Sequence, residues 1–153
     1  MSATPPPVLT ELKLSDAMKD AIDSAFGSSK PIAVSYVDEN GAPHLSYRGS
    51  TQAYSDTQLA IWARNPEGGI LESIAKNPAV ALIYGNFDPN NRGFMIFRGR
   101  AHVDTSDAVR THVYEHAHEF ERNRDKDRKG VAVVIDLDSV EGFFGGARLE
   151  MRR

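Results

Sequence analysis

An arginine followed by small and hydroxylated residues, Arg48-Gly49-Ser50-Thr51, is the first stretch whose chemistry suggests a ligand. The planar arginine fork donates several hydrogen bonds to a phosphate, and hydroxyl groups add further donors. A glycine between them lets a ligand approach the backbone closely. The stretch therefore predicts an anion-binding strand end, although an outward-facing polar strand has the same composition.

A second stretch places the strand-like run Ile61-Trp62-Ala63 before Arg64, and the pair Gly68-Gly69 before a helical pattern. Free backbone amides at the start of a helix bind anions, and glycines let the anion come close. Trp62 either packs on a planar ring or fills the core. We expect phosphate contacts here, and a tight strand-to-helix turn is the structural alternative.

Three histidines, His112, His116 and His118, lie close together in the sequence. The first two are one helical turn apart, which is the spacing of a two-histidine metal clamp. The chain has no cysteine, so thiolate ligands and thiolate nucleophiles are excluded. Charges of both signs fill residues 119–129 and predict a solvated helix end or loop. We therefore predict no metal site and a polar, solvated position for the histidines.

Strand-like runs outnumber helical ones and follow one another as hairpin pairs. Asn40-Gly41 between two such runs is a strong hairpin signal. Helical periodicity covers Leu12–Phe26, Ile70–Lys76 and Asp107–His116. The last two strands are expected at Gly130–Leu137 and Ser139–Phe144, before a short basic tail. The order predicts a mainly β, α+β fold of about six strands, either a small antiparallel barrel or a strongly curled sheet, with short flanking helices, and it argues against a doubly wound parallel sheet.

The 153 residues suffice for one domain with a real core. Residues 1–11 include three consecutive prolines and predict a disordered tail, which leaves residues 12–153 as a single domain. A formal net charge of −3 argues against a nucleic-acid partner. No apolar run approaches the roughly 20 residues that span a membrane, and the N-terminus lacks the pattern of a signal peptide. We therefore expect a cytoplasmic protein.

The order of these pieces resembles the FMN-binding split barrels of the pyridoxamine 5′-phosphate oxidase-like superfamily. Three short motifs carry the resemblance: the hairpin followed by Pro43-x-x-x-x-Arg48, the helix end Lys76-Asn77-Pro78-Ala79-Val80-Ala81-Leu82, and the strand with Gly99-x-Ala101. The similar region runs from Pro31 to about Phe144. It implies a six-stranded split β-barrel that forms a homodimer, with FMN in a groove between the subunits.

The resemblance also implies which residues contact the cofactor. By position these are Arg48, Gly49, Ser50 and Thr51 on one strand, Ile61, Trp62, Ala63 and Arg64 on the next, and Gly68 and Gly69 at the helix start. Arg48 and Arg64 would hold the phosphate.

Two departures from the family pattern bear on function. The family's oxidases carry Ser-Arg-Lys where this chain has Glu67-Gly68-Gly69, so the usual phosphate-binding lysine is missing. Near the C-terminus they carry Arg-Leu-His-x-Arg, whereas here Glu150 replaces the histidine and would repel a substrate phosphate. We expect an FMN-binding oxidoreductase that acts on a small molecule other than pyridoxamine phosphate. A deazaflavin-dependent reductase and a haem-binding or non-catalytic protein are the alternatives on this fold.

Overall fold

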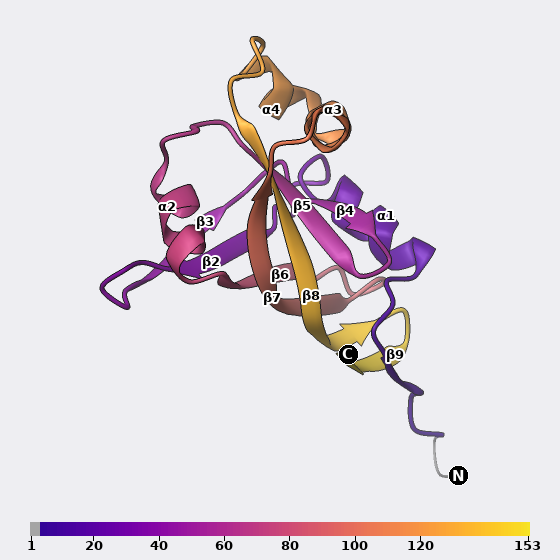
Figure 1. Cartoon of the computed structure of the whole chain (residues 1–153). Coiled ribbons are helices and arrows are strands. Elements are labelled where there is room, and N and C mark those ends of the chain that lie inside the picture. The colour runs from indigo at the N-terminus through magenta and orange to yellow at the C-terminus, as the bar shows by residue number, and fades with distance from the viewer. Residues whose placement is uncertain (1–3) are drawn as a thin grey trace.

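The computed structural model describes residues 4–153, in which nine strands form one mixed sheet flanked by four helices (Figure 1). The strands are β1 (Val8–Glu11), β2 (Ala33–Val37), β3 (Pro43–Tyr47), β4 (Gln52–Ser55), β5 (Gln58–Ala63), β6 (Ala79–Asn86), β7 (Gly93–Asp104), β8 (Val131–Phe144) and β9 (Ala147–Arg152). The helices are α1 (Asp16–Ser24), α2 (Gly69–Lys76), α3 (Asp107–His116) and α4 (Glu119–Asn123). None of these helices is long and apolar enough to cross a membrane.

The long strand β8 organises the sheet. Antiparallel pairing with β7 covers nearly all of β8, whereas the opposite edge of β8 is shared by two strands. β5 pairs with residues 131–136 of β8, and β9 pairs with residues 139–144. From β7 the sheet continues through β6 and β2 to β3, while β4 joins β5 and β1 joins β9. The register of β7 against β8 shifts between Arg98 and Gly99, at a bulge that increases the local bend.

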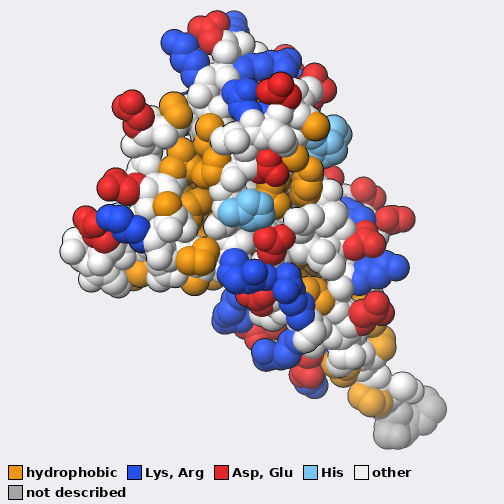
Figure 2. All heavy atoms as spheres, viewed as in Figure 1, with side chains coloured by type: hydrophobic (Ala, Val, Ile, Leu, Met, Phe, Trp, Pro, Cys, Tyr) orange, Lys and Arg blue, Asp and Glu red, His pale blue; other side chains and the backbone are white. Residues whose placement is uncertain are grey.

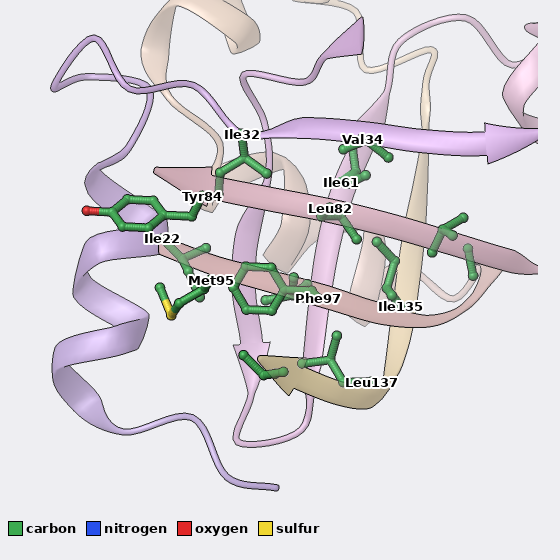
Figure 3. Packing of buried hydrophobic residues seen from close by; sticks show 14 of the residues in the cluster. Ile22, Ile32, Val34, Ile61, Leu82, Tyr84, Met95, Phe97, Ile135 and Leu137 are labelled. Atoms are coloured by element: carbon green, nitrogen blue, oxygen red, sulfur yellow. The ribbon is translucent and has the colours of Figure 1, made fainter. Parts of the chain in front are cut away.

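The main core lies inside this bent sheet and beneath α1. Residues of period two on β6 and β7, such as Leu82, Met95 and Phe97, point inward (Figure 3). Helix α1 lies within the predicted Leu12–Phe26 segment and begins at Asp16, because the Ser15 hydroxyl accepts a hydrogen bond of 3.2 Å from Met18 N. Its apolar face, which includes Ile22, closes one side of the core.

A second, smaller core lies on the other face of β5. Ile61 and Ala63 belong to the main core, whereas Ala60 and Trp62 point the opposite way. Trp62 packs there with residues of α3, including Tyr114. Strand β5 therefore separates two apolar clusters, and both of its faces are covered.

The mainly β prediction is confirmed, but the sheet is not the predicted six-stranded antiparallel split barrel. Within residues 4–153 the sheet has nine strands and does not close, because β4 pairs only with β5 and β3 ends the main path. The two strands expected on either side of Asp138 form the single strand β8, since β7 offers a continuous partner along it.

Both predicted tails also differ from the structure. Val8–Glu11 of the expected disordered segment forms β1, which runs parallel to β9, and Arg148 N donates a 2.8 Å hydrogen bond to Pro7 O. The expected basic tail is β9, in which Leu149 and Met151 are buried. A free strand edge supplies the backbone partners that order these segments, and composition alone does not reveal such an edge. Residues 1–3 of the expected tail lie outside the described residues.

Candidate functional site

Arg48 lies just beyond β3, at the turn that leads into β4. Its backbone N–H still pairs with Ile32 O at 2.9 Å, whereas its carbonyl accepts hydrogen bonds from both the N–H and the hydroxyl of Thr51. The guanidinium Nε of Arg48 is buried and has no hydrogen-bond partner among the described residues. A buried donor without a partner is costly, so this atom has an unused capacity to hold an anion.

The two predicted hydroxyl ligands, Ser50 and Thr51, are already used by the fold. Ser50 Oγ accepts a hydrogen bond from Trp62 N at 2.9 Å and donates one to Trp62 O at 3.1 Å. Thr51 Oγ1 donates to Arg48 O at 2.7 Å. These bonds join the turn after β3 to β5, so the hydroxyls position Arg48 and are not free donors for a phosphate.

Trp62 is likewise occupied, with only 3% of its surface exposed. Its indole Nε1 donates a 2.9 Å hydrogen bond to Asp125 Oδ2, and the ring packs edge-on against Tyr114 at 5.2 Å between centroids. The Arg110 guanidinium lies 5.5 Å from the ring centroid. The geometry favours the core-filling interpretation of Trp62 over a stacking surface for a cofactor.

The buried carboxylate of Asp125 completes this small core. Burial raises its pKa, but hydrogen bonds from Lys129 N, from the Trp62 indole and from Gly130 N outweigh burial and hold the pKa below its usual value. The prediction of a wholly solvated charge block over residues 119–129 is therefore wrong for Asp125. A run of charged letters does not show which side chain the backbone turns inward.

Arg64 follows β5 directly and extends toward α4. Its Nε lies 3.8 Å from Oε2 of Glu121, whose side chain is only 10% exposed. A methyl group added at Gly49 would collide with Oε1 of Glu121 and would lie 2.8 Å from the ring of Phe26. Gly49 and Arg64 are thus brought together around a carboxylate that the sequence analysis missed, because Glu121 sits in a mixed-charge run, and Arg48 directly precedes Gly49 in the same turn.

Gly68 and Gly69 open α2 as predicted, and Gly68 at the N-cap provides no side-chain hydrogen bond to the helix. Gly69 lines a cavity of about 210 Å³ between α2 and the β2–β3 hairpin. Its other lining residues are Tyr36, Asp38, Glu39, Asn40, His44, Glu72, Ser73 and Lys76. Three of these are carboxylates, which disfavours an anion. The start of α2 is therefore a negatively charged environment, whereas Arg48 and Arg64 provide positive charge.

A stacked aromatic pair forms one wall of that cavity. The rings of Tyr36 and His44 lie 4.8 Å apart and nearly parallel. His44 Nε2 is 2.8 Å from Asp38 Oδ2, and this contact together with the backbone N–H of Ala42 lowers the pKa of Asp38. Local contacts hold this wall in place, and the carboxylate of Asp38 gives it a negative charge.

The histidines occupy polar positions, as expected. His112 and His116 stack at 4.0 Å, and burial together with the neighbouring His116 lowers the pKa of His112. His118 has a structural role, because its Nδ1 accepts a hydrogen bond from Phe120 N at the start of α4. No group of three or more potential metal ligands occurs within residues 4–153.

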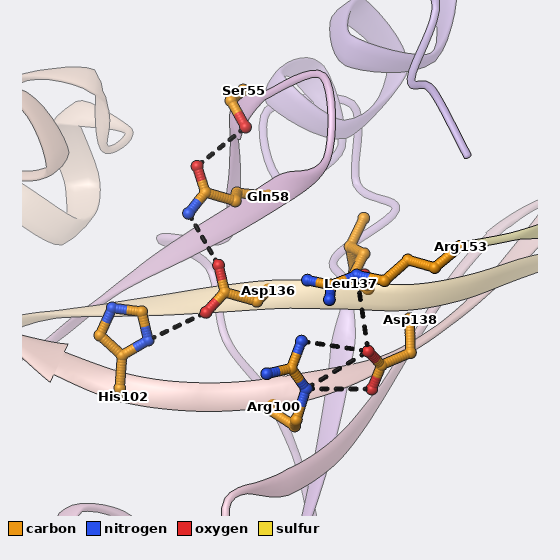
Figure 4. A network of polar contacts seen from close by, with 8 residues as sticks. All are labelled: Ser55, Gln58, Arg100, His102, Asp136, Leu137, Asp138 and Arg153. Atoms are coloured by element: carbon orange, nitrogen blue, oxygen red, sulfur yellow. Dashed lines mark hydrogen bonds and ion pairs between the residues drawn. The ribbon is translucent and has the colours of Figure 1, made fainter. Parts of the chain in front are cut away.

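Polar side chains that sequence reasoning missed connect β5, β7 and β8 on the outer face (Figure 4). Gln58 Nε2 donates a 2.8 Å hydrogen bond to Asp136 Oδ1, and His102 Nδ1 lies 3.3 Å from Asp136 Oδ2. Arg100 contacts Asp138 two residues further on. Figure 2 shows Lys and Arg side chains mixed with acidic ones over the lower half of this face. The sequence signal for this network was the spacing of Asp136 and Asp138, which are two residues apart on β8.

The C-terminal Arg148 and Glu150 lie on the exposed face of β9 and form an ion pair. Leu149 between them is buried. Glu150 stands where the family's oxidases place a histidine. Its carboxylate neutralises part of the positive charge of Arg148.

The comparisons with known proteins agree with this architecture. The sequence profile named pyridoxamine 5′-phosphate oxidase matches residues 18–142, most of the chain. The chain belongs to this family. No curated protein was found to match it.

Solved structures of several bacterial proteins share this fold. HupZ from Group A Streptococcus is 22% identical, with 88% of this chain and 97% of that chain covered and a TM-score of 0.62. A Clostridium acetobutylicum protein related to general stress protein 26, of the pyridoxine phosphate oxidase family, is 12% identical, with 88% and 95% covered and a TM-score of 0.59. An FMN-binding protein from Syntrophomonas wolfei is 8% identical, with 81% and 84% covered and a TM-score of 0.61.

Among the predicted contacts, the two arginines fit the phosphate of a family flavin. Among residues 4–153, Arg48 has a buried donor without a partner, and the charged partner of Arg64 is a carboxylate beyond hydrogen-bonding distance. In this family member Ser50, Thr51 and Trp62 position the arginines, while Ile61 and Ala63 fill the main core. Fewer side chains than the sequence predicts therefore keep hydrogen-bond donors for a ligand.

Proposed function

We propose that the chain is an FMN-binding oxidoreductase whose phosphate site consists of Arg48, Gly49 and Arg64. The observation that carries this proposal is the buried Arg48 Nε, which has no partner in the described part of the chain, next to a glycine that permits close approach. A phosphate oxygen would satisfy this donor through a charge-assisted hydrogen bond. Family membership supports the choice of a flavin as the molecule that brings the phosphate.

The bound flavin would supply the redox chemistry, and the protein would bind and orient it. This division suits a chain without cysteine and without a described nucleophile–base arrangement. The contacts of Ser50 with Trp62 hold the turn that carries Arg48 in place. An arginine that is fixed before the ligand arrives loses little conformational freedom on binding.

The substrate is proposed to be a small molecule other than pyridoxamine phosphate. Glu150 pairs with Arg148 on the exposed face of β9 and adds a negative charge beside that arginine. A phosphate dianion is repelled by such a carboxylate wherever solvent screening is weak. Incubation of the FMN-loaded protein with pyridoxamine phosphate and oxygen tests this. Turnover of about 1–10³ per second, the usual enzyme range, would contradict it.

The proposed assembly is a homodimer that covers the outer face of β3, β2 and β6. Tyr47, Ala33 and Ile83 lie opposite one another in register, so their side chains share this face. Tyr47 is 72% exposed, and Leu45, two residues earlier on the same strand, is 73% exposed. Contiguous exposed apolar surface of this kind is typical of an interaction site.

Light scattering tests the dimer. The parent protein should give twice the chain mass at micromolar concentration, and Tyr47→Arg should give the mass of one chain. Leu9→Arg is the control, because Leu9 is a partly exposed apolar residue on β1, at the other end of the sheet. A parent protein with the mass of one chain would contradict the proposed assembly.

Titration of the ligand-free protein tests the cofactor. FMN should bind more tightly than riboflavin, which lacks the phosphate, and more tightly than a deazaflavin or haem. Preference for the deazaflavin or haem would replace FMN by that cofactor. Equal binding of FMN and riboflavin would show that no phosphate site exists at Arg48 and Arg64.

A further inference from the structure

Helix α4 covers the phosphate site proposed above and is held there by aromatic contacts. The ring of Phe26, just after α1, contacts His118 edge-on at 5.0 Å and Phe120 at 5.7 Å between centroids. With this five-residue helix docked in place, the side chain of Glu121 points inward to the Arg48–Gly49 turn and to Arg64. A negative group of the protein itself thus lies where the ligand phosphate is expected.

The carboxylate of Glu121 is weakly satisfied at this position. The distance to Arg64 Nε is 3.8 Å, which is an ion pair and not a hydrogen bond. The side chain is only 10% exposed, so it has given up most of its hydration. Buried charges are stable when they are both paired and hydrogen-bonded, and within residues 4–153 this carboxylate has the ion pair alone.

The hydrogen bonding of the positively charged residues at this site is also incomplete. Arg48 Nε has no partner from residues 4 to 153, and Glu121 approaches the backbone of Gly49 closely because the glycine has no side chain. A phosphate has more acceptor oxygens than a carboxylate and forms short hydrogen bonds with guanidinium groups. A phosphate therefore satisfies Arg64 better than Glu121 does at 3.8 Å, and it brings further acceptor oxygens to the turn that carries Arg48.

We propose that Glu121 is the residue that sets anion selectivity at this site, by occupying the phosphate position until a ligand phosphate displaces it. The inference rests on the proposed phosphate site and adds a competitor within the chain. Weakly bound inorganic anions are disfavoured, because each must displace the carboxylate. A flavin phosphate succeeds because contacts to the rest of the ligand add to its binding free energy.

The experiment compares Glu121→Gln with Glu119→Gln. The first substitution keeps the shape of the side chain and removes its charge, while Glu119 lies on the same short helix and is exposed, which makes it a matched control for net charge. Inorganic phosphate is the first probe, and calorimetry measures its binding. We expect Glu121→Gln to bind phosphate about tenfold more tightly than the parent, which corresponds to about 1.4 kcal/mol, and Glu119→Gln to stay within about twofold.

Unchanged or weaker phosphate binding by Glu121→Gln would overturn the inference, and so would an equal gain in Glu119→Gln. Circular dichroism verifies the fold, and Glu121→Ala serves as the second variant if the glutamine variant does not fold.

FMN is the second probe. If phosphate binding rises but neither protein binds FMN, the proposed function fails and the inference stands. If the parent binds FMN and Glu121→Gln binds FMN and phosphate less tightly, the inference fails and the proposed function stands.

Discussion

Trp62 and Arg64 are two residues apart at the end of β5, yet their surroundings differ sharply. The polar atom of Trp62 is hydrogen-bonded, its ring is packed, and its carboxylate partner Asp125 receives three hydrogen bonds. Arg64 is 39% exposed and has one long ion pair. The first environment stabilises the fold, whereas the second leaves donors available for a ligand. Incomplete satisfaction of charged groups is what distinguishes the candidate site from the core beside it.

Truncation of Trp62 should give the largest change. Trp62→Ala removes the centre of the small core and should lower the free energy of unfolding by about 3–5 kcal/mol. Trp62→Phe keeps most of the packing but leaves Asp125 with one donor fewer, at a cost of about 1–3 kcal/mol. Urea unfolding measures both. A loss in the phenylalanine variant as large as in the alanine variant would contradict the packing role.

Replacement of Asp125 should give the next largest change and a dependence on pH. The folded-state pKa of Asp125 lies below its ordinary value of 3.8, so the unfolded chain binds the proton more readily. The stabilisation is present above that ordinary value and disappears as the pH falls through the folded-state pKa. Asp125→Asn should lower stability at pH 7 by about 1–3 kcal/mol for each buried donor left unpaired.

Urea midpoints at pH 7 and at pH values below 3.8 test this behaviour. The difference between the parent and Asp125→Asn should be large at pH 7 and should shrink in acid. A difference that stays constant with pH would mean that the carboxylate charge does not contribute.

Arg48→Ala should separate binding from stability. Because its Nε has no partner among the residues that the structure describes, its removal should change the free energy of unfolding by no more than about 0.5 kcal/mol. FMN binding should weaken by about 1.5–3 kcal/mol, the contribution of a hydrogen bond to a charged group. Arg92→Ala, at an exposed position before β7, is the control. A stability loss without a binding loss would place Arg48 with the structural residues and refute the phosphate site.

The smallest effect is expected for His112→Ala combined with His116→Ala. The two rings stack on each other at the surface of α3, and no metal-ligand group of three includes them among the described residues. Stability should change by no more than about 0.5 kcal/mol, and FMN affinity should stay within about twofold. Loss of a bound metal or haem from this variant, detected by elemental analysis and absorbance, would favour the haem-binding alternative.

The sequence by itself determined the mainly β class, the family and the positions of Arg48 and Arg64. These follow from local signals: the Asn40-Gly41 hairpin, period-two apolar runs, and short motifs in a fixed order. The helical segments that became Asp16–Ser24 and Gly69–Lys76 were predictable for the same reason, since helical periodicity depends on residues three and four apart in the sequence.

Only the tertiary structure decided how those residues are used. Ser50, Thr51 and Trp62 have the composition of a ligand site, but their hydrogen bonds go to backbone atoms and to Asp125, which are distant in the sequence or hidden in a turn. Glu121 gave no signal, because in a run of mixed charges every carboxylate looks solvated. Burial of a charge depends on which surfaces meet when α4 docks beside Phe26, and that contact joins segments about a hundred residues apart, beyond the reach of periodicity.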